Sequence, residues 1–374
     1  MTEPSPDARM RSYLQLVATG PELSKSLDQH QAEDALSMIL AGEIDAIRSA
    51  IFLIALRMKR ETDAENIGAL NALLKFQKHA TVHCPQVLAI ADPFNGFNRG
   101  LPATPFLPAV LAACGLPCYI HGLKQAGPKY GVTAHMVLDA AGRKIDQNVD
   151  QAAKSMENPA IGWCYIDQSA YIPALHGLVE LRDTMVKRTC ISTLEVVLKP
   201  LSGALHTHLL TGFVHKAYPP VYSALAKHVG FDSAAIVRGV EGGCIPSLSQ
   251  VSRYFGYHGD EELSLHKLSA REIGIDQQDR AVPVPEEMIA LLDNTSYQQV
   301  DILQPLLEHV VTLGVDALSN QPGPMRDSLI YGAAISLSHA GICQSMAEGA
   351  ERAREALQSG EALSRFNAGS ETVS

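Results

Sequence analysis

Apolar residues recur at helical spacing through the N-terminal part of the chain. The clearest helical stripe is formed by Ile44, Ile47, Ile51, Ile54 and Met58. Capping boxes are predicted at helix starts here, one of Asp28 with Gln31 and one of Thr62 with Glu65, and a third near the C-terminus, of Ser345 with Glu348. The pattern predicts a separate all-helical domain over 12–82, after a polar, proline-containing segment over 1–11 that we expect to be disordered. Residues 171–187 also have a helical pattern, and we expect them to pack on this domain.

The pattern changes near Pro85, where short apolar runs begin to alternate with helical stretches. Buried strands are predicted over 86–92, 116–122, 162–168 and 234–239. Strands that alternate with helices form a mainly parallel sheet with helices on its faces. The predicted fold class is therefore α/β, with the α/β domain over 83–366 and a flexible tail over 367–374. Residues 258–300 have an irregular pattern, and helices close the domain.

The composition indicates a folded chain and excludes several function classes. The 374 residues are 46% hydrophobic and 19% charged, which allows a sizeable core. A net charge of -10 excludes a surface that is basic overall, but it is compatible with a local basic groove. No run approaches the ~18 apolar residues of a membrane span, and the N-terminus has no signal-peptide pattern. The 7 cysteines include no C-x-x-C pair and are typical of reduced thiols, so we expect a cytoplasmic protein without membrane contact.

Acidic residues are missing from two stretches that retain their basic residues. Residues 93–138 contain no Asp or Glu, and residues 184–231 contain only Glu195, so these windows carry net charges of +3 and +4. Buried segments are also poor in acids, but burial would deplete Lys and Arg as well. The pattern therefore favours an anion-binding pocket in the strand-end loops. If the anion is a nucleic acid, the candidate contacts are Lys124, Lys199 and Lys216.

The loop over 91–100 follows the first predicted strand, where backbone N–H groups and the dipole of the next helix can hold an anion. Gly96 lets the backbone approach a ligand, Asn95 can donate, and Arg99 adds charge. Such residues are common in any loop between a strand and a helix, so a purely structural loop is an equal alternative.

If residues 206–208 were extended, His206 and His208 would point to the same side of the chain, which is one arrangement that holds a metal ion. No Cys or carboxylate lies nearby in the sequence. The pattern therefore favours an ordinary loop or groove histidine pair, and we predict no metal site.

Several longer segments resemble one enzyme superfamily. They are the helical module over 20–65, the pair His121-Gly122 with Lys129 and Gly131, the set Arg182, Arg188 and Thr189, and the C-terminal helical segment over 325–363. With these segments, residues 12–366 resemble the anthranilate phosphoribosyltransferase superfamily (glycosyl transferase family 3, class II nucleoside phosphorylase–phosphoribosyltransferase fold). The resemblance implies a homodimer formed through the helical domain. It also implies phosphate or ligand contacts from Asn95, Gly96, Arg99, Thr104, His121, Gly122, Lys129 and Gly131, and acceptor or anion contacts from Arg182 and Arg188.

Departures from the family pattern bear on activity. The family's glycine-rich phosphate loop falls at 91–95, where almost none of it is kept. Its magnesium-holding D-G-x-D-E segment falls at 241–245, where Cys244 and Ile245 replace both metal-holding carboxylates. This combination resembles the divergent, DNA-binding YbiB-type branch of the superfamily.

Two functions remain open from the sequence. The first is a protein that binds a phosphorylated small molecule or another phosphate-rich ligand such as nucleic acid in the interdomain cleft, with no catalytic residue and no cofactor assigned. The alternative is an active glycosyl or phosphoribosyl transferase that uses phosphoribosyl pyrophosphate (PRPP) and magnesium with an unassigned, anthranilate-like acceptor.

Overall fold

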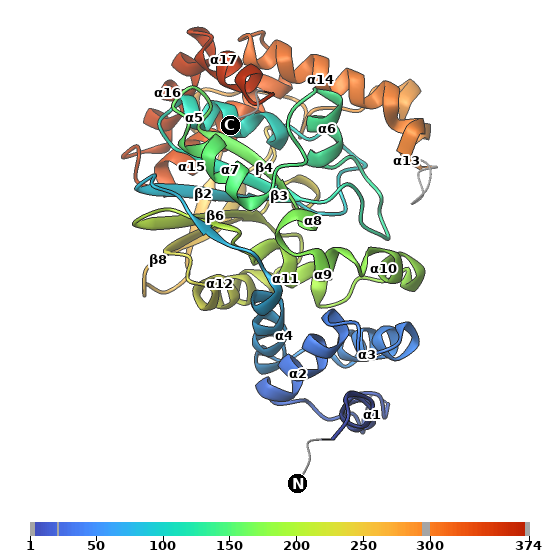
Figure 1. Cartoon of the computed structure of the whole chain (residues 1–374). Helices are drawn as coiled ribbons and strands as arrows, with labels where there is room; N and C mark the ends of the chain where they lie inside the picture. Colours follow the sequence, from blue (N-terminus) through green and yellow to red (C-terminus); the bar gives the residue numbers. More distant parts are fainter. Residues whose placement is uncertain (1–3, 21, 294–299, 371–374) are drawn as a thin grey trace.

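The computed structural model describes residues 4–20, 22–293 and 300–370, and it places a small helical domain against a larger α/β domain (Figure 1). The described chain begins in the helical domain and ends among the helices on the far side of the sheet. The predicted fold class is confirmed. Within the described ranges, no helix combines the length and the apolar character that crossing a membrane requires.

Four helices form the N-terminal domain: α1 (Pro6–Val17), α2 (Gln29–Leu40), α3 (Ala46–Lys59) and α4 (Asp63–Phe76). The two capping boxes predicted for this domain are confirmed, with Asp28 at the start of α2 and Thr62 at the start of α4. The third is formed only in part, since Ser345 accepts from the Glu348 N–H while the Glu348 carboxylate accepts from the Gln344 N–H. Helix α1 begins inside the segment 1–11 whose pattern suggests disorder. It forms there because the Ser5 side chain accepts a hydrogen bond from the Ala8 N–H at 3.3 Å and Pro6 suits the first turn.

Helix α3 is apolar on two faces. Phe52, Leu53 and Leu56 are buried in the domain core. Two residues of the predicted stripe face outward instead, since Ile47 and Met58 are 73% and 77% exposed. The helical period is confirmed, but period alone does not say which of two apolar faces meets the core.

A seven-stranded sheet crosses the α/β domain in the order β4-β3-β2-β6-β7-β8-β9. Its strands are β2 (Gln86–Ala91), β3 (Cys118–Gly122), β4 (Trp163–Asp167), β6 (His206–Gly212), β7 (Ser233–Val237), β8 (Ser252–His258) and β9 (Ser264–Leu268). The first five in this order run parallel, and β8 and β9 add an antiparallel edge. A separate parallel pair joins β1 (Ala80–Thr81) to β5 (Leu201–Ser202).

The four predicted strands are confirmed as β2, β3, β4 and β7. The sequence pattern missed β6, β8 and β9. Strand β6 begins with polar residues although most of it is buried, and β9 is exposed along most of its length, so neither shows a continuous apolar run. Strand β9 lies within the segment 258–300, whose pattern predicts irregular structure.

Helices cover both faces of the sheet. One face packs against α5 (Leu107–Ala113), α6 (Ala134–Ala140), α14 (Gln304–Leu318), α15 (Pro324–His339), α16 (Met346–Gln358) and α17 (Glu361–Ala368). The other face packs against α7 (Val149–Glu157), α8 (Gln168–Tyr171), α9 (Pro173–His176), α11 (Ile191–Leu194) and α12 (Tyr218–Val229). The remaining short elements are α10 (Val179–Met185), α13 (Ile289–Asp293), η1 (Thr104–Phe106), η2 (Glu195–Val197), η3 (Val240–Gly242), η4 (Ala270–Ile273), η5 (Glu286–Met288) and η6 (Val300–Leu303). Helix α17 extends to residue 368, into the predicted tail, and residues 371–374 lie outside the described ranges.

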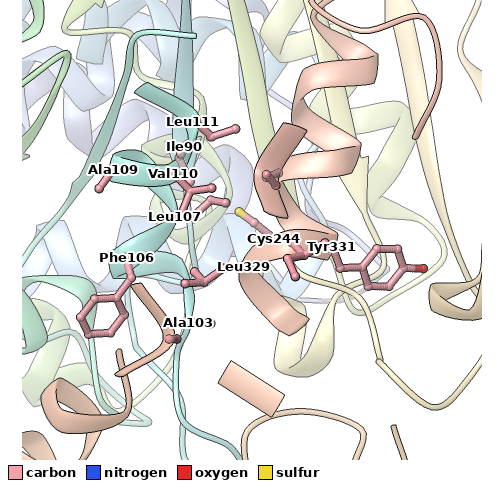
Figure 2. Packing of buried hydrophobic residues seen from close by; sticks show 14 of the residues in the cluster. Ile90, Ala103, Phe106, Leu107, Ala109, Val110, Leu111, Cys244, Leu329 and Tyr331 are labelled. Atoms are coloured by element: carbon pink, nitrogen blue, oxygen red, sulfur yellow. The ribbon is translucent and has the colours of Figure 1, made fainter. Parts of the chain in front are cut away.

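Two hydrophobic cores result from the alternation of side chains along the strands. Leu88 and Ile90 of β2 join the core under α5 and α15, where Figure 2 shows Ile90 near Leu107 and Val110. Val87 and Ala89 point to the opposite face and join a core that continues into the helical domain. Helix α9 contacts α4, and α10 contacts α3. The shared core thus fixes the helical domain against the sheet.

Candidate functional site

The sheet has a topological switch point between strands β2 and β6. The chain runs from β2 outward to β3 and β4 on one side, and from β6 to β7 on the other. The loops after β2 and β6 therefore leave in opposite directions, and open α/β sheets bind ligands in the crevice at such a point. A cleft with a volume of about 150 Å³ lies there. Its walls come from residues 93–95 after β2, residues 211–215 around the end of β6, and helices α3, α10, α11 and α12.

Three arginines line this cleft, and two of them reach it from distant parts of the chain. Arg188 is exposed and lies against the Asn95 amide, whose oxygen accepts hydrogen bonds from Nε at 3.0 Å and from Nη2. Arg57 comes from α3, donates to the Tyr218 hydroxyl at 3.2 Å and lies 3.7 Å from a carboxylate oxygen of Glu61. No carboxylate within the described ranges forms an ion pair with Arg188. Arg188 can therefore bind an anionic group of a ligand.

Arg182, predicted to contact an acceptor or an anion, is already paired in the cleft wall. Its terminal nitrogens donate to both carboxylate oxygens of Glu195 at 2.7 and 2.8 Å, and Gln168 donates to the same carboxylate at 3.1 Å. The side chains of Arg182 and Glu195 are only 7% and 2% exposed. Such a two-bond, charge-assisted pair is among the strongest that Arg makes. Glu195 therefore balances the charge of Arg182 and takes up one N–H of each terminal nitrogen.

Lys129 and Arg99 meet around the carboxylate of Glu241 at the cleft wall. Lys129 Nζ donates to the Gly96 carbonyl oxygen at 2.6 Å and forms an ion pair with Glu241. The backbone N–H groups of Asn98 and Arg99 donate to the same carboxylate at 3.1 and 2.6 Å. Burial lowers the pKa of Lys129, and the neighbouring Glu241 opposes that shift. The Arg99 side chain is exposed, so the contact that Arg99 makes here comes from its backbone.

The predicted glycines bring two protein loops together. Gly96 has φ +72°, and a Cβ there would stand 2.3 Å from the Gly131 carbonyl oxygen. A Cβ on Gly131 would stand 2.5 Å from the Phe97 nitrogen. Phe97 and Val132 exchange backbone hydrogen bonds at 3.0 and 2.9 Å. The close approach that was expected between glycine backbone and ligand is therefore made between these loops, while Gly122 is buried at the end of β3.

His121 and Thr104 are buried beneath the cleft, each 2% exposed. The Nδ1 atom of His121 lies 3.2 Å from the Tyr171 hydroxyl, and the imidazole meets the Phe94 ring edge-on. Burial lowers the pKa of His121 to about 3, so the ring is neutral at pH 7. Thr104 starts η1 beside Asp92, a buried carboxyl whose pKa burial raises. Neither predicted residue presents a charge to a ligand.

The three lysines predicted to contact nucleic acid do not line the cleft. Lys199 donates to a backbone carbonyl at 2.7 Å and lies 5.3 Å from the centre of the Phe231 ring, so its role is local packing. Lys124 and Lys216 are exposed. Lys216 follows His215, which does line the cleft, and is the best placed of the three to meet an extended ligand.

Positions 244 and 245 belong to the apolar core. Cys244 is fully buried, its Sγ lies 3.4 Å from the Ala91 carbonyl oxygen, and Figure 2 shows it among apolar side chains. Burial raises the pKa of this thiol well above its ordinary value. Ile245 packs close to Gly332. Among residues 4–20, 22–293 and 300–370, no group of at least three His, Cys, Asp and Glu side chains could hold a metal ion.

The histidine pair His206 and His208 lies in the first half of β6, away from the strand end that forms the cleft. The Nδ1 atom of His208 lies 2.7 Å from the Ser233 hydroxyl, and its Nε2 lies 3.1 Å from Gln86 Oε1. Burial lowers the pKa of His208 to about 4. Both ring nitrogens of His208 are thus engaged by protein groups.

Sequence reasoning missed Arg57, Tyr218 and Tyr222 as cleft residues. No local pattern marks Arg57, because it reaches the cleft only through the packing of one domain on the other. Glu195 did carry a signal, since it is the only acidic residue of 184–231. One acid retained in a basic, apolar window indicates an internal ion pair.

The fold and the cleft together define a two-domain α/β protein with a cleft at the carboxyl ends of parallel strands. Residues 103–363 match the model described as glycosyl transferase family, a/b domain, and residues 11–76 match the model described as glycosyl transferase family, helical bundle domain. The chain therefore belongs to the glycosyl transferase family.

The chain is similar to anthranilate phosphoribosyltransferases along nearly its whole length. That of Aromatoleum aromaticum is 28% identical over 359 residues, which cover 92% of this chain and 95% of that protein. That of Novosphingobium aromaticivorans is 25% identical over 353 residues, which cover 93% and 97%. The solved structure of the Saccharomyces cerevisiae enzyme in complex with PRPP and Mg has the same fold, with a TM-score of 0.75 at 18% identity and 96% coverage of both chains.

Proposed function

We propose that this chain is an anthranilate phosphoribosyltransferase-like protein that binds a phosphate-bearing ligand in the interdomain cleft and does not transfer a phosphoribosyl group efficiently. The observation that carries the proposal is the exposed Arg188 at the switch point, which forms no ion pair within the described ranges. Arg57 lines the same cleft. Guanidinium groups bind phosphate oxygens through charge-assisted, often bidentate hydrogen bonds.

The absence of efficient transfer is inferred from positions 244 and 245. Transfer from PRPP develops negative charge on the departing pyrophosphate, which metal ions and preorganised donors stabilise. Magnesium requires oxygen ligands, whereas Cys244 holds a buried thiol and Ile245 a hydrocarbon side chain. Removing one charge-stabilising group typically costs about 10²–10³ in rate. These residues do not fit a catalytic magnesium, and we derive no step through one.

The pairing of Arg182 also supports this inference. Anthranilate, the acceptor in the relatives' names, carries a carboxylate. In this chain Glu195 already binds both terminal nitrogens of Arg182. A carboxylate acceptor would therefore meet an arginine whose charge Glu195 already balances, which weakens the attraction between them, and taking over both terminal nitrogens would break a buried ion pair at a cost of several kcal/mol by order of magnitude.

The proposal is tested by calorimetric titration of the full chain with inorganic pyrophosphate and with PRPP, each with and without Mg²⁺. We expect binding, and we expect Arg188→Ala to weaken it. Loss of a hydrogen bond to a charged group costs roughly 1.5–3 kcal/mol, which is about 10- to 150-fold in Kd. The matched control is Arg271→Ala, because Arg271 is a 71% exposed arginine on η4 and does not line the cleft.

A second arm uses labelled single-stranded DNA at two salt concentrations. If the phosphates belong to nucleic acid, affinity falls steeply with salt and Arg188→Ala reduces the slope by roughly 0.7 for one lost phosphate contact. Binding of DNA but not of PRPP would identify the ligand as nucleic acid. Affinities for all probes that are unchanged in Arg188→Ala would refute the cleft as the phosphate site.

The alternative is an active transferase with an anthranilate-like acceptor. The nearly full-length similarity to anthranilate phosphoribosyltransferases favours it. It predicts product formation from PRPP, which the binding proposal does not.

We also propose that the protein is a homodimer formed through the helical domain. The exposed apolar face of α3, with Ile47, Ile51 and Met58, supports this assembly, because monomers rarely leave such a stripe in water. A cytoplasmic location is proposed on the basis of the 7 cysteines, which are all free and mostly buried, as is usual for proteins of reducing compartments.

A further inference from the structure

The carboxylate of Glu241 is bound as an anionic ligand would be bound. It accepts hydrogen bonds from two consecutive backbone N–H groups, those of Asn98 and Arg99, and it pairs with the Lys129 ammonium. Consecutive N–H groups beside a cation form a typical site for phosphate oxygens. The Glu241 side chain is 8% exposed, so this protein carboxylate fills the site.

The donors around Glu241 are held in place independently of it. Lys129 Nζ also donates to the Gly96 carbonyl oxygen at 2.6 Å, and the Asn98 side chain donates to the Lys129 carbonyl oxygen at 3.2 Å. The loop that carries the two N–H groups is tied to the neighbouring loop by the backbone bonds between Phe97 and Val132. Removal of the carboxylate would therefore leave a preformed set of donors with a half-buried, uncompensated ammonium.

The backbone conformation of Glu241 is unfavourable for its residue type. Glu241 lies in the short η3 turn with φ 54°, a left-handed conformation that is unfavourable for a residue with a Cβ. Glycines follow it at 242 and 243, and Gly242 also has a positive φ. Glu241 lines the cleft, so its side chain can move into that space when another anion replaces it.

We propose that the Asn98 and Arg99 N–H groups and Lys129 Nζ form a phosphate cradle that Glu241 occupies as an internal, displaceable anion. The external occupant is a phosphate group of the ligand whose remainder lies near Arg188, so the inference deepens the proposed function. Glu241 then regulates the site: it blocks the cradle until a multiply charged phosphate competes for the same donors.

The test measures the affinity of inorganic pyrophosphate for the full chain by calorimetry. In Glu241→Gly the competing carboxylate is gone and glycine suits the left-handed backbone, so we expect binding at least about tenfold tighter than in the wild type. Glu241→Gln keeps the side chain's size without its charge, and it should also bind more tightly. Lys129→Met added to Glu241→Gly should abolish the gain. Thermal unfolding and circular dichroism confirm that each variant is folded.

Glu351→Ala is the control for overall charge, because Glu351 is a 70% exposed carboxylate on α16. Equal or weaker binding in Glu241→Gly and Glu241→Gln would overturn the inference, as would an equal gain in Glu351→Ala or a gain that survives Lys129→Met. This failure is distinct from failure of the proposed function. If wild-type binding depends on Arg188 while Glu241→Gly changes nothing, the cradle is refuted and the cleft proposal stands. If Arg188→Ala changes nothing while the Lys129-dependent gain appears, the cradle stands and Arg188 is refuted as the anchor of the ligand in the cleft.

Discussion

The buried pair of Arg182 and Glu195 should contribute to stability in a way that single substitutions expose. We consider Arg182→Met and Glu195→Gln, alone and together. Arg182→Met leaves the Glu195 carboxylate buried without its cation, while Gln168 still donates to it. Glu195→Gln leaves the guanidinium without its carboxylate but keeps an amide oxygen for Gln168. Each single variant thus retains the hydrogen bond to Gln168 and loses the charge balance.

Removing one partner of a buried ion pair lowers the free energy of unfolding by about 3–5 kcal/mol, because the other partner's charge remains buried without compensation. With roughly 2–4 °C lost per kcal/mol for chains of about 150–250 residues, the melting temperature should fall by roughly 5 °C or more in each single variant. Replacement of both partners removes the charge imbalance, and buried pairs are often replaced by neutral groups at little cost. The double variant should therefore be clearly more stable than the sum of the two single losses predicts, with a coupling of up to about 3 kcal/mol.

The assay is scanning calorimetry of the four proteins, with Arg271→Met as the control. Arg271 forms an ion pair with Asp276 at 3.1 Å, but these side chains are 71% and 72% exposed, and exposed pairs contribute only about 0–1 kcal/mol. Losses in the single variants that are no larger than that of the control, or losses that simply add in the double variant, would refute the reasoning.

Three further predictions concern separate parts of the molecule. Burial lowers the pKa of His121 from 6.5 to about 3, so below pH 6.5 the unfolded chain binds more protons than the folded one, and the folded state loses stability as the pH is lowered. His121→Phe should therefore make the melting temperature depend less on pH between pH 6.5 and 4, and an unchanged dependence would contradict this. Gly96→Ala should lower the free energy of unfolding by well over the ~1 kcal/mol that alanine costs in a left-handed backbone conformation, because its Cβ would stand 2.3 Å from a carbonyl oxygen. Gly142→Ala, at φ +68° with nothing within 4 Å, should cost only that ~1 kcal/mol, and equal losses of the two variants in urea unfolding would contradict the prediction. Ile47→Glu combined with Met58→Glu should convert the proposed dimer into a folded monomer in sedimentation experiments, and a dimer that persists would place the interface elsewhere.

Local features of the fold were predictable from the sequence. The capping boxes at Asp28 and Thr62 are confirmed because they depend on residues three positions apart. The strands β2, β3, β4 and β7 are confirmed because buried parallel strands are continuous apolar runs. Features decided by distant partners were not predictable. The exposed face of α3 and the polar start of β6 depend on what packs against them.

The candidate site likewise has features that the sequence predicts and features that depend on distant partners. The acid-poor windows indicated an anion site, and Asn95 and Arg188 do lie together in the cleft. The sequence did not show that Glu195 binds Arg182 or that Glu241 binds Lys129, since the latter pair is far apart in the chain. It also did not show that Gly96 and Gly131 pack on each other. A basic residue in a binding motif is available to a ligand only if no protein carboxylate reaches it first, and that depends on tertiary contacts.

The central claim is that the cleft keeps phosphate binding without phosphoribosyl transfer. The most direct measurement incubates the full chain with PRPP, Mg²⁺ and anthranilate, follows the loss of anthranilate fluorescence, and records PRPP binding in the same preparation. We predict binding that Arg188→Ala weakens, with no turnover above the protein-free rate. Sustained turnover that disappears in Arg188→Ala would contradict the account and identify the chain as an active transferase.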